Sequence, residues 1–346
     1  MWMPTLNRFK TCLTSLCVGL FALTGLTAEP LLVWPTPSTA FDEGLPYTEF
    51  VQATASGNPE SALFGCVRND GRRFHEGLDI RPILPRRRGE ATDPIYAVAD
   101  ATVAHINSVA GNSSYGRYIV LVHDSLEPAF YTLYSHLRSI NDSVEVGQRV
   151  NQGQVIGIMG RSAGGYTIPQ SRAHLHFESG LRLSDSFQNW YDQQQFGSAN
   201  HHGVHNGMNL VAWDPLDFFK WVRDFPNGTV QEYLDGLIVG AIIQVRSSRI
   251  PDFVERYPSL ITRPIPAAGV SGWQIEFTPW GLPMRWTPLD SEHPLASRNE
   301  GEVIVSGVHP SALQAYACRQ LISMSVDQAG LGRGGERIIR ILFDFN

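Results

Sequence analysis

Short apolar runs, each broken after a few residues by glycine, asparagine, serine or proline, fill the chain between residues 63 and 219. Runs of this length are typical of β-strands, because a helix needs a longer stretch with apolar residues three and four apart. The clearest runs cover residues 95–106, 118–123, 130–137 and 154–159. The 32 glycines and 22 prolines follow no period and indicate turns, so a mainly β fold built on antiparallel sheets is expected here.

The chain of 346 residues is long enough for two domains. Residues 225–228 (FPNG) form a turn sequence and predict a boundary. Beyond it, three runs are typical of strands and one has helical apolar spacing, which predicts a small α+β domain. These are strands at 237–245, 273–277 and 337–345 and a helix at 311–324. The expected division is a signal peptide at 1–28, an extended lead-in at 29–60, a β-rich domain at 61–225 and an accessory domain at 226–346.

The first 28 residues have the pattern of a signal peptide. Arg8 and Lys10 precede an uncharged stretch from residue 11 to 27, and Ala28 ends it with the small residue typical of a signal-peptide cleavage site. The alternative is a retained membrane anchor, although a stretch of this length is short for crossing a bilayer. An exported protein, periplasmic or extracellular and associated with the cell envelope, is therefore expected.

Charge and cysteine content limit the partners. The net charge of −6 argues against nucleic acid or an anionic membrane surface as the main partner, and no second membrane span is predicted after the leader. Loss of the leader leaves two of the four cysteines, Cys66 and Cys318. In an oxidising compartment they either form one disulfide or stay as two buried thiols. No CxxC pair exists, so a metal site would need histidine and carboxylate ligands.

Three short segments carry histidines in patterns suited to chemistry. In residues 75–79 (HEGLD), an extended chain places His75 and Asp79 on one face, with Gly77 leaving open space between them. In residues 174–178 (HLHFE), a strand turns His174, His176 and Glu178 to one side and leaves an apolar opposite face.

In residues 131–137 (YTLYSHL), Tyr134 and His136 are expected on one face, opposite Leu133 and Leu137. Each segment alone is a weak signal. Together they fit a catalytic zinc site, in which three protein ligands leave a fourth position for water. Zinc accepts both imidazole nitrogen and carboxylate oxygen.

The three segments occur in the order typical of the lysostaphin/LytM-type peptidoglycan endopeptidases, and the chain resembles this family over about residues 74–219. The resemblance implies the duplicated hybrid motif fold and one zinc ion per chain, bound by His75, Asp79 and His176. It also implies His174 as the general base, with His136 orienting water or, when protonated, stabilising developing charge. Glu178 either orients a ligand histidine or is an exposed strand residue, and Tyr134 is a candidate to support the site or contact substrate.

The sequence departs from the family pattern in places that bear on the substrate. Arg73 replaces the usual glycine two positions before the first ligand. The loop at 81–94 is longer and more basic than usual, residues 166–172 add length, and residues 183–210 are inserted before the closing Asp214-Pro215 pair. The insertion carries His201, His202 and His205 and is either a surface loop or a wall of the substrate groove.

The expected function is therefore a zinc metalloendopeptidase that cuts peptide cross-links of peptidoglycan. A D-alanine to diamino acid bond is favoured over a Gly–Gly bond, because no targeting module for glycine bridges is visible. The alternative is a non-catalytic relative that binds cell wall or activates another hydrolase. A structural β-domain with coincidental histidines would leave the ordered motifs unexplained.

Overall fold

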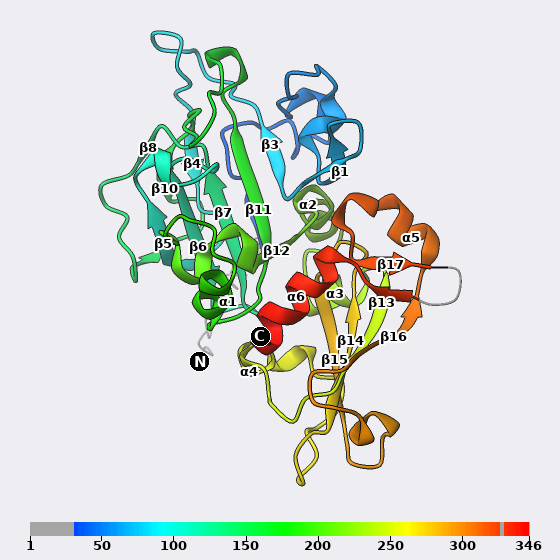
Figure 1. Cartoon of the computed structure of the whole chain (residues 1–346). Coiled ribbons are helices and arrows are strands. Elements are labelled where there is room, and N and C mark those ends of the chain that lie inside the picture. Colours follow the sequence, from blue (N-terminus) through cyan, green and yellow to red (C-terminus); the bar gives the residue numbers. More distant parts are fainter. Residues whose placement is uncertain (1–30, 326–328, 346) are drawn as a thin grey trace, which may run out of the picture.

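The structure, a computed structural model, describes residues 31–325 and 329–345. The expected signal peptide lies outside the described residues. None of the helices formed by the described residues is long and apolar enough to cross a membrane. The chain folds mostly into antiparallel sheets with few helices, as the sequence predicts (Figure 1).

A seven-stranded antiparallel sheet forms the larger part of the molecule. Its order is β12-β11-β7-β6-β5-β9, and β3 pairs with the first residues of β11 on the edge opposite β7. The strands are β3 (Leu78–Ile80), β5 (Ala101–Asn107), β6 (Tyr118–His123), β7 (Phe130–Ser135), β9 (Arg149–Val150), β11 (Leu175–Arg182) and β12 (Leu210–Trp213). Two small sheets accompany it: β1 (Gly65–Arg68) with β2 (Arg73–His75), and β4 (Pro94–Tyr96) with β10 (Val155–Ile158) and β8 (Ser139–Ile140).

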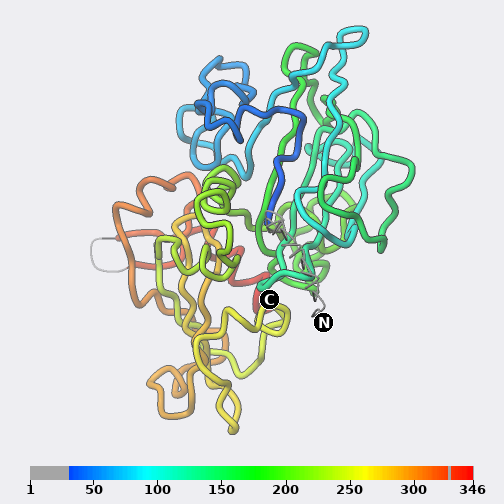
Figure 2. Tube along the Cα trace, turned by 180° about the vertical axis from the view of Figure 1, so that it is seen from behind, coloured from blue at the N-terminus to red at the C-terminus, as the bar shows by residue number. Residues whose placement is uncertain are grey.

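Most strand predictions in this part are confirmed to within two residues, and one is wrong. The run at 95–106 is not a single strand: it divides into β4 and β5, which belong to different sheets. The segment expected as a lead-in has little regular structure, but Trp34, Phe41 and Phe50 are buried in the core. The Trp34 ring lies 5.0 Å from that of Phe219, and Figure 2 shows this dark blue segment running along the main sheet.

The C-terminal part is built on a four-stranded antiparallel sheet in the order β15-β14-β13-β16. Its strands are β13 (Ala241–Val245), β14 (Gly272–Phe277), β15 (Pro283–Leu289) and β16 (Val303–Val308), and a hairpin of β17 (Ile322–Met324) and β18 (Ala329–Leu331) follows. The helices of the chain are α1 (Phe187–Gln193), α2 (Pro215–Asp224), α3 (Val230–Asp235), α4 (Asp252–Arg256), α5 (Pro310–Ala315) and α6 (Arg333–Phe343).

Two predictions in the C-terminal part are wrong. The helix expected at 311–324 stops at Ala315, and the rest forms the 3-10 turn η9 (Ala317–Arg319) and strand β17. The strand expected at 337–345 is helix α6. Its buried residues Ile338, Ile339, Ile341 and Leu342 follow the one-sided spacing of an amphipathic helix.

Cys66 in β1 and Cys318 in η9 form a disulfide that joins the two parts of the chain. Of the two alternatives for these cysteines, the bridge is the one observed. The two residues are 252 positions apart, and their Cα atoms are separated by 5.9 Å. Buried apolar residues of both parts also form one continuous cluster, so the C-terminal part packs directly against the β-rich part.

Replacing both cysteines with serine should lower the free energy of unfolding by about 2–5 kcal/mol, because the bridge closes a long loop of the unfolded chain. Urea unfolding of the wild type and the double variant measures the difference. A reductant should shift the wild-type midpoint and leave that of the double variant unchanged. Two free thiols per chain in unfolded, unreduced wild-type protein would contradict the bridge.

Candidate functional site

Three of the side chains singled out from the sequence meet where β2, β3 and β11 come together. His75 Nε2, Asp79 Oδ1 and His176 Nδ1 lie 2.9 to 3.1 Å from one another. The register pairs Asp79 directly with His176, so their side chains leave the sheet on the same face. His75 is the last residue of β2, and all three residues are buried, with at most 5% of their surface exposed.

The two histidines are held in defined orientations by their other ring nitrogens. His75 Nδ1–H donates to the Leu63 carbonyl at 2.8 Å, and His176 Nε2–H donates to Glu178 Oε1 at 2.9 Å. When both rings are neutral, the nitrogens that face each other are acceptors, and Asp79 Oδ1 is a third. Three converging acceptors repel one another unless a proton or a metal ion lies between them.

These three atoms fit a zinc ion. Two imidazole nitrogens and one carboxylate oxygen form a common set of catalytic zinc ligands. Bonds of 2.0–2.1 Å in a tetrahedral site place neighbouring ligand atoms about 3.3 Å apart, close to the separations in this group. Among the residues that the structure describes, this is the one group of histidine, cysteine or acidic side chains with such convergence.

Glu178 is a buried acceptor, not an exposed strand residue. It is 1% exposed, and besides His176 it accepts hydrogen bonds from Tyr115 at 2.6 Å and Tyr131 at 3.0 Å. The position of Glu178 is therefore fixed from three sides. Outer contacts of this kind orient the ligands of metal sites. The two tyrosines carry no motif signal, and the sequence did not predict them.

Arg68 is a further contact that the sequence did not predict. Its guanidinium donates to the outer oxygen, Oδ2, of Asp79. Burial alone would raise the pKa of Asp79, but its electrostatic interactions with His75, His174 and Arg68 and its hydrogen bond with His176 outweigh burial and hold this pKa well below its usual range. Asp79 is therefore an ionised carboxylate with its inner oxygen available to a cation.

The protonation of the metal-free group follows from these contacts. Burial lowers the pKa of His75. Burial also acts to lower the pKa of His176, but its hydrogen bonds with the carboxylates of Asp79 and Glu178 outweigh it and raise that pKa to about 9. One proton is thus held between the two carboxylates, and a metal ion would take over its charge-balancing role.

His174 and His136 flank the group without belonging to it. His174 Nε2 lies 3.7 Å from Asp79 Oδ1, and the His136 ring is centred 4.7 Å from the His174 ring. Both donate from Nδ1 to a backbone carbonyl, His174 to Arg172 at 2.7 Å and His136 to Ser162 at 2.8 Å. Their Nε2 atoms are therefore acceptors.

Burial lowers the pKa of His174 and holds that of His136 well below its usual range, so both rings are neutral. The expectation of a protonated His136 does not fit this burial. A neutral imidazole with an open Nε2 can accept a proton from water.

Residues 73–186 match the model of peptidase family M23. This segment belongs to peptidase family M23. M23 peptidases are zinc-dependent enzymes that act on peptidoglycan, so membership implies a peptidoglycan-hydrolysing metallopeptidase.

Three solved structures illustrate the similarity. The catalytic domain of lysostaphin from Staphylococcus simulans is 23% identical, with 44% of this chain and 82% of that chain covered and a TM-score of 0.28. The catalytic domain of the prophage-encoded M23 protein EnpA from Enterococcus faecalis is 21% identical, covering 38% and 80%, with a TM-score of 0.27. A zinc-containing peptidase from Vibrio cholerae is 28% identical, covering 37% and 35%, with a TM-score of 0.26. No curated protein matches the chain in sequence.

Tyr134 does not lie at the site, which corrects the expected shared face with His136. In β7 it is paired with Phe177, and its ring packs 5.2 Å from the Phe177 ring in the core. Its hydroxyl accepts hydrogen bonds from Val98 N and from Thr132. His136 reaches the site because β7 ends at Ser135 and His136 turns into a left-handed backbone conformation, with φ 59°.

Gly77 has a different role from the one expected. It leaves no space for a metal and water, because a Cβ at this position would lie 2.3 Å from the Phe177 carbonyl oxygen and 3.0 Å from the His176 ring. The absence of a side chain lets the HEGLD segment of the M23 domain approach β11 closely. Gly77 is needed for the approach that brings His75 and His176 together.

A cavity of about 540 Å³ is lined by His75, His136 and His176. Its walls include several of the positions at which the sequence departs from the family pattern. These are Arg73, Tyr166 and, from the insertion at 183–210, Tyr191, His201 and His202. The insertion at 183–210 therefore forms part of the cavity wall. His205 of the insertion does not line the cavity, and its ring packs 5.7 Å from the His105 ring. Two arginines of the C-terminal part, Arg319 and Arg337, also line the cavity.

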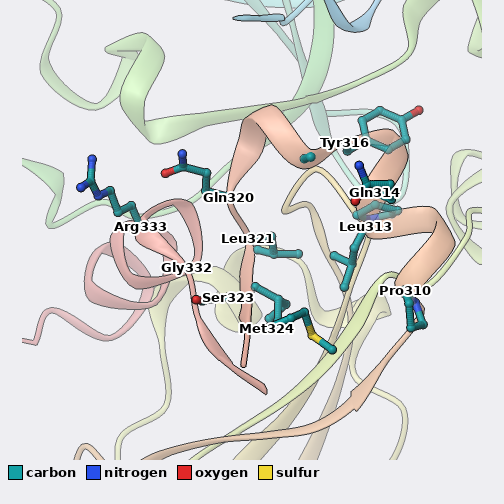
Figure 3. Close-up of a pocket in the computed structure, with 13 residues that line it drawn as sticks. Pro310, Leu313, Gln314, Tyr316, Gln320, Leu321, Ser323, Met324, Gly332 and Arg333 are labelled. Carbon is teal, nitrogen blue, oxygen red and sulfur yellow. The ribbon is translucent and has the colours of Figure 1, made fainter. Parts of the chain in front are cut away.

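A second cavity of about 420 Å³ lies in the C-terminal part, between α5, η9 and the β17 strand (Figure 3). Leu313, Leu321 and Met324 line it together with uncharged polar side chains and Arg333. No histidine, cysteine or carboxylate is among the described residues on its wall. It offers none of the groups that hydrolysis needs.

Glu178→Gln should weaken zinc binding about 10- to 100-fold, because an amide carries no charge and cannot accept all three hydrogen bonds that the carboxylate accepts. Zinc titration against a competing chelator measures the affinity. Glu276→Gln is the matched control, since Glu276 forms its ion pair with Arg285 in the C-terminal sheet. Equal affinities for wild type and Glu178→Gln would show that Glu178 does not support the metal.

Proposed function

We propose that the chain is a zinc metalloendopeptidase that hydrolyses peptide cross-links of peptidoglycan, at a D-alanine to diamino acid bond and not at a Gly–Gly bond. The convergence of His75 Nε2, Asp79 Oδ1 and His176 Nδ1 on one point is the observation that carries this proposal. These residues hold one zinc ion per chain. When bound, zinc supplies Lewis-acid activation of water and of the scissile carbonyl.

His174 serves as the general base. Its Nε2 is an acceptor, and the hydrogen bond from Nδ1 to the Arg172 carbonyl fixes the direction in which the ring points. A base so placed takes the proton of the attacking water and delivers it to the amine that leaves. His174 stands near the carboxylate of Asp79, which stabilises the imidazolium formed during the transfer.

His136 orients the attacking water. Its Nδ1 proton is committed to the Ser162 carbonyl, so its Nε2 can accept a hydrogen bond from water but cannot donate one to an oxyanion. Of the two roles considered for His136, this tautomer supports the orienting role.

The protein is exported, and its substrate lies in the cell envelope.

His174→Ala should keep one zinc per chain and lose turnover by about 10²–10⁴-fold, because the base is not a ligand. His176→Ala should lose both zinc and turnover, as should wild type treated with a chelator until zinc is restored. Metal analysis of the purified protein and digestion of purified peptidoglycan measure the two properties. His293→Ala is the control, since its ring caps a 3-10 turn of the C-terminal part.

The outcomes separate the alternatives. Loss of zinc in His174→Ala would mean that the two histidines of the HLH segment have exchanged roles. Zinc binding without hydrolysis in wild type would favour a non-catalytic cell-wall binder or activator. Mass analysis of the released fragments identifies the bond, and fragments with cut glycine bridges would overturn the assignment to the diamino acid.

A further inference from the structure

We propose that Arg319 and Arg337 form a carboxylate-binding subsite in the cavity above His75, Asp79 and His176. The subsite takes a free carboxylate of the peptide substrate and rests on the peptidase function proposed above. Both arginines come from the C-terminal part, outside the segment that matches family M23. The subsite thus gives the C-terminal part a direct share in substrate selection.

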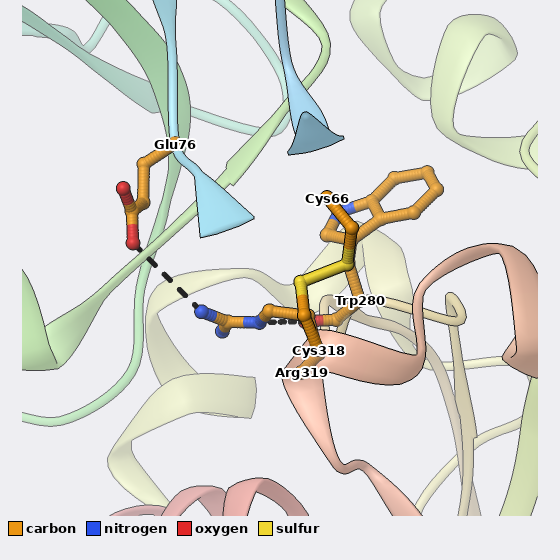
Figure 4. Close-up of a disulfide and its surroundings, with 5 residues drawn as sticks. All are labelled: Cys66, Glu76, Trp280, Cys318 and Arg319. Atoms are coloured by element: carbon orange, nitrogen blue, oxygen red, sulfur yellow. Dashed lines mark hydrogen bonds and ion pairs between the residues drawn. A yellow bond between two sulfur atoms is a disulfide. The ribbon is translucent and has the colours of Figure 1, made fainter. Parts of the chain in front are cut away.

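Arg319 is held firmly against the metal-binding part of the chain. Its Nε donates to the Trp280 carbonyl at 3.0 Å, and its guanidinium carbon lies 4.6 Å from the centre of the Phe74 ring. The preceding residue, Cys318, is bonded to Cys66 (Figure 4). These contacts leave the outer nitrogens of Arg319 facing the cavity, where the nearest carboxylate oxygen, on Glu76, is 4.0 Å away.

Arg337 lies beside Arg319 because helix α6 begins against the Arg319 backbone. A Cβ at Gly334 would lie 2.0 Å from the Arg319 carbonyl oxygen, so only glycine permits this approach. One turn further along the helix, Arg337 reaches the same cavity. Its buried Nε has no hydrogen-bond partner among the described residues.

The charge of this cluster is not balanced within the described protein. Glu76 is the one acidic side chain on the cavity wall, whereas Arg68, Arg73, Arg319 and Arg337 all contribute to it. Arg68 is paired with Asp79, so Glu76 faces two half-buried arginines and cannot neutralise both. Burial, together with the charge of Arg337, lowers the pKa of Arg319 to about 10, a direct sign of the cost of holding this charge.

A buried, unpaired guanidinium is costly, and an anionic ligand removes that cost. The chain as a whole carries a net charge of −6, so a cationic cavity here runs against the overall balance. Guanidinium groups bind carboxylates through paired, parallel hydrogen bonds. A glycine bridge offers no side-chain carboxylate, whereas a diamino acid can carry a free one beside the amine that forms the cross-link. The two arginines therefore favour a cross-link whose diamino acid carries a free carboxylate over a glycine bridge.

The test uses two synthetic peptides that contain the D-alanyl to diaminopimelyl bond. One has the diaminopimelyl carboxylates free, and the other has them converted to carboxamides. We expect wild type to bind and cleave the acid form about 10- to 100-fold better than the amide form, as judged by calorimetry and by kcat/KM. Arg337→Gln should bring this ratio close to one, mainly through KM. Arg337→Lys should restore part of the preference, since it keeps the charge but not the fork of donors.

Arg340→Gln is the matched control, because Arg340 is exposed on the same helix and does not line the cavity. It should keep the wild-type ratio. Thermal unfolding of Arg337→Gln verifies folding, and loss of a half-buried charge without an ion pair should not lower the melting temperature.

The subsite and the peptidase function can fail separately. Cleavage by wild type without preference for the acid peptide, or an unchanged ratio in Arg337→Gln, would overturn the subsite and leave the peptidase intact. Preferential binding of the acid peptide that Arg337→Gln abolishes, without any cleavage, would support the subsite and overturn the peptidase. Absence of both binding preference and cleavage would overturn both.

Discussion

The close approach of the HEGLD segment to strand β11 is the contact on which the site depends. At Gly77 the backbone comes so near to Phe177 that even a methyl group would overlap the carbonyl oxygen. This approach continues as the β3–β11 pairing, which sets Asp79 directly opposite His176. His75, two residues before Gly77, is thereby brought to the same point from another sheet. A sheet register of this kind fixes side-chain positions more tightly than a loop can.

The same arrangement buries the carboxylates of Asp79 and Glu178, and hydrogen bonds from neighbouring side chains offset the cost of burying them. Glu178 accepts hydrogen bonds from His176, Tyr115 and Tyr131. Asp79 accepts a hydrogen bond from the Arg68 guanidinium. Unpaired buried carboxylates would protonate or destabilise the fold. In this structure both carboxylates are hydrogen-bonded, and their contacts with His176 fix the direction of its ring. Burial keeps His174 and His136 neutral beside this group, which suits the roles of base and water-orienting residue that we propose for them.

The sequence alone predicted the parts of the fold and site that follow from local pattern. Alternation and turn residues were sufficient for β6, β7 and β10, and the ordered histidine segments indicated the three converging ligand atoms. It could not show that residues 95–106 change sheets, because local pattern does not say which partner a strand pairs with. Helix α6 was missed because two glycines and three isoleucines disfavour a helix locally, and tertiary packing overrides that preference.

The predictions around the site failed for related reasons. Tyr134 was expected beside His136 on the assumption of a continuous strand, whereas the left-handed turn at His136 reverses the alternation. Arg68, Tyr115 and Tyr131 lie in ordinary strands and loops and become relevant only through contacts distant in sequence. No periodic or motif signal marks such residues.

The C-terminal part contributes two arginines, Arg319 and Arg337, to the wall of the cavity. The Cys66–Cys318 bond holds the Arg319 segment against the β-rich part. The close contact of Gly334 in α6 with the Arg319 backbone then holds Arg337 beside it. A part of the chain that served only to brace the sheet could make these contacts with apolar side chains, at lower electrostatic cost. Two half-buried arginines instead raise the free energy of the ligand-free state. That cost is recovered when an anion binds, so the ligand-free protein is already arranged for a charged substrate.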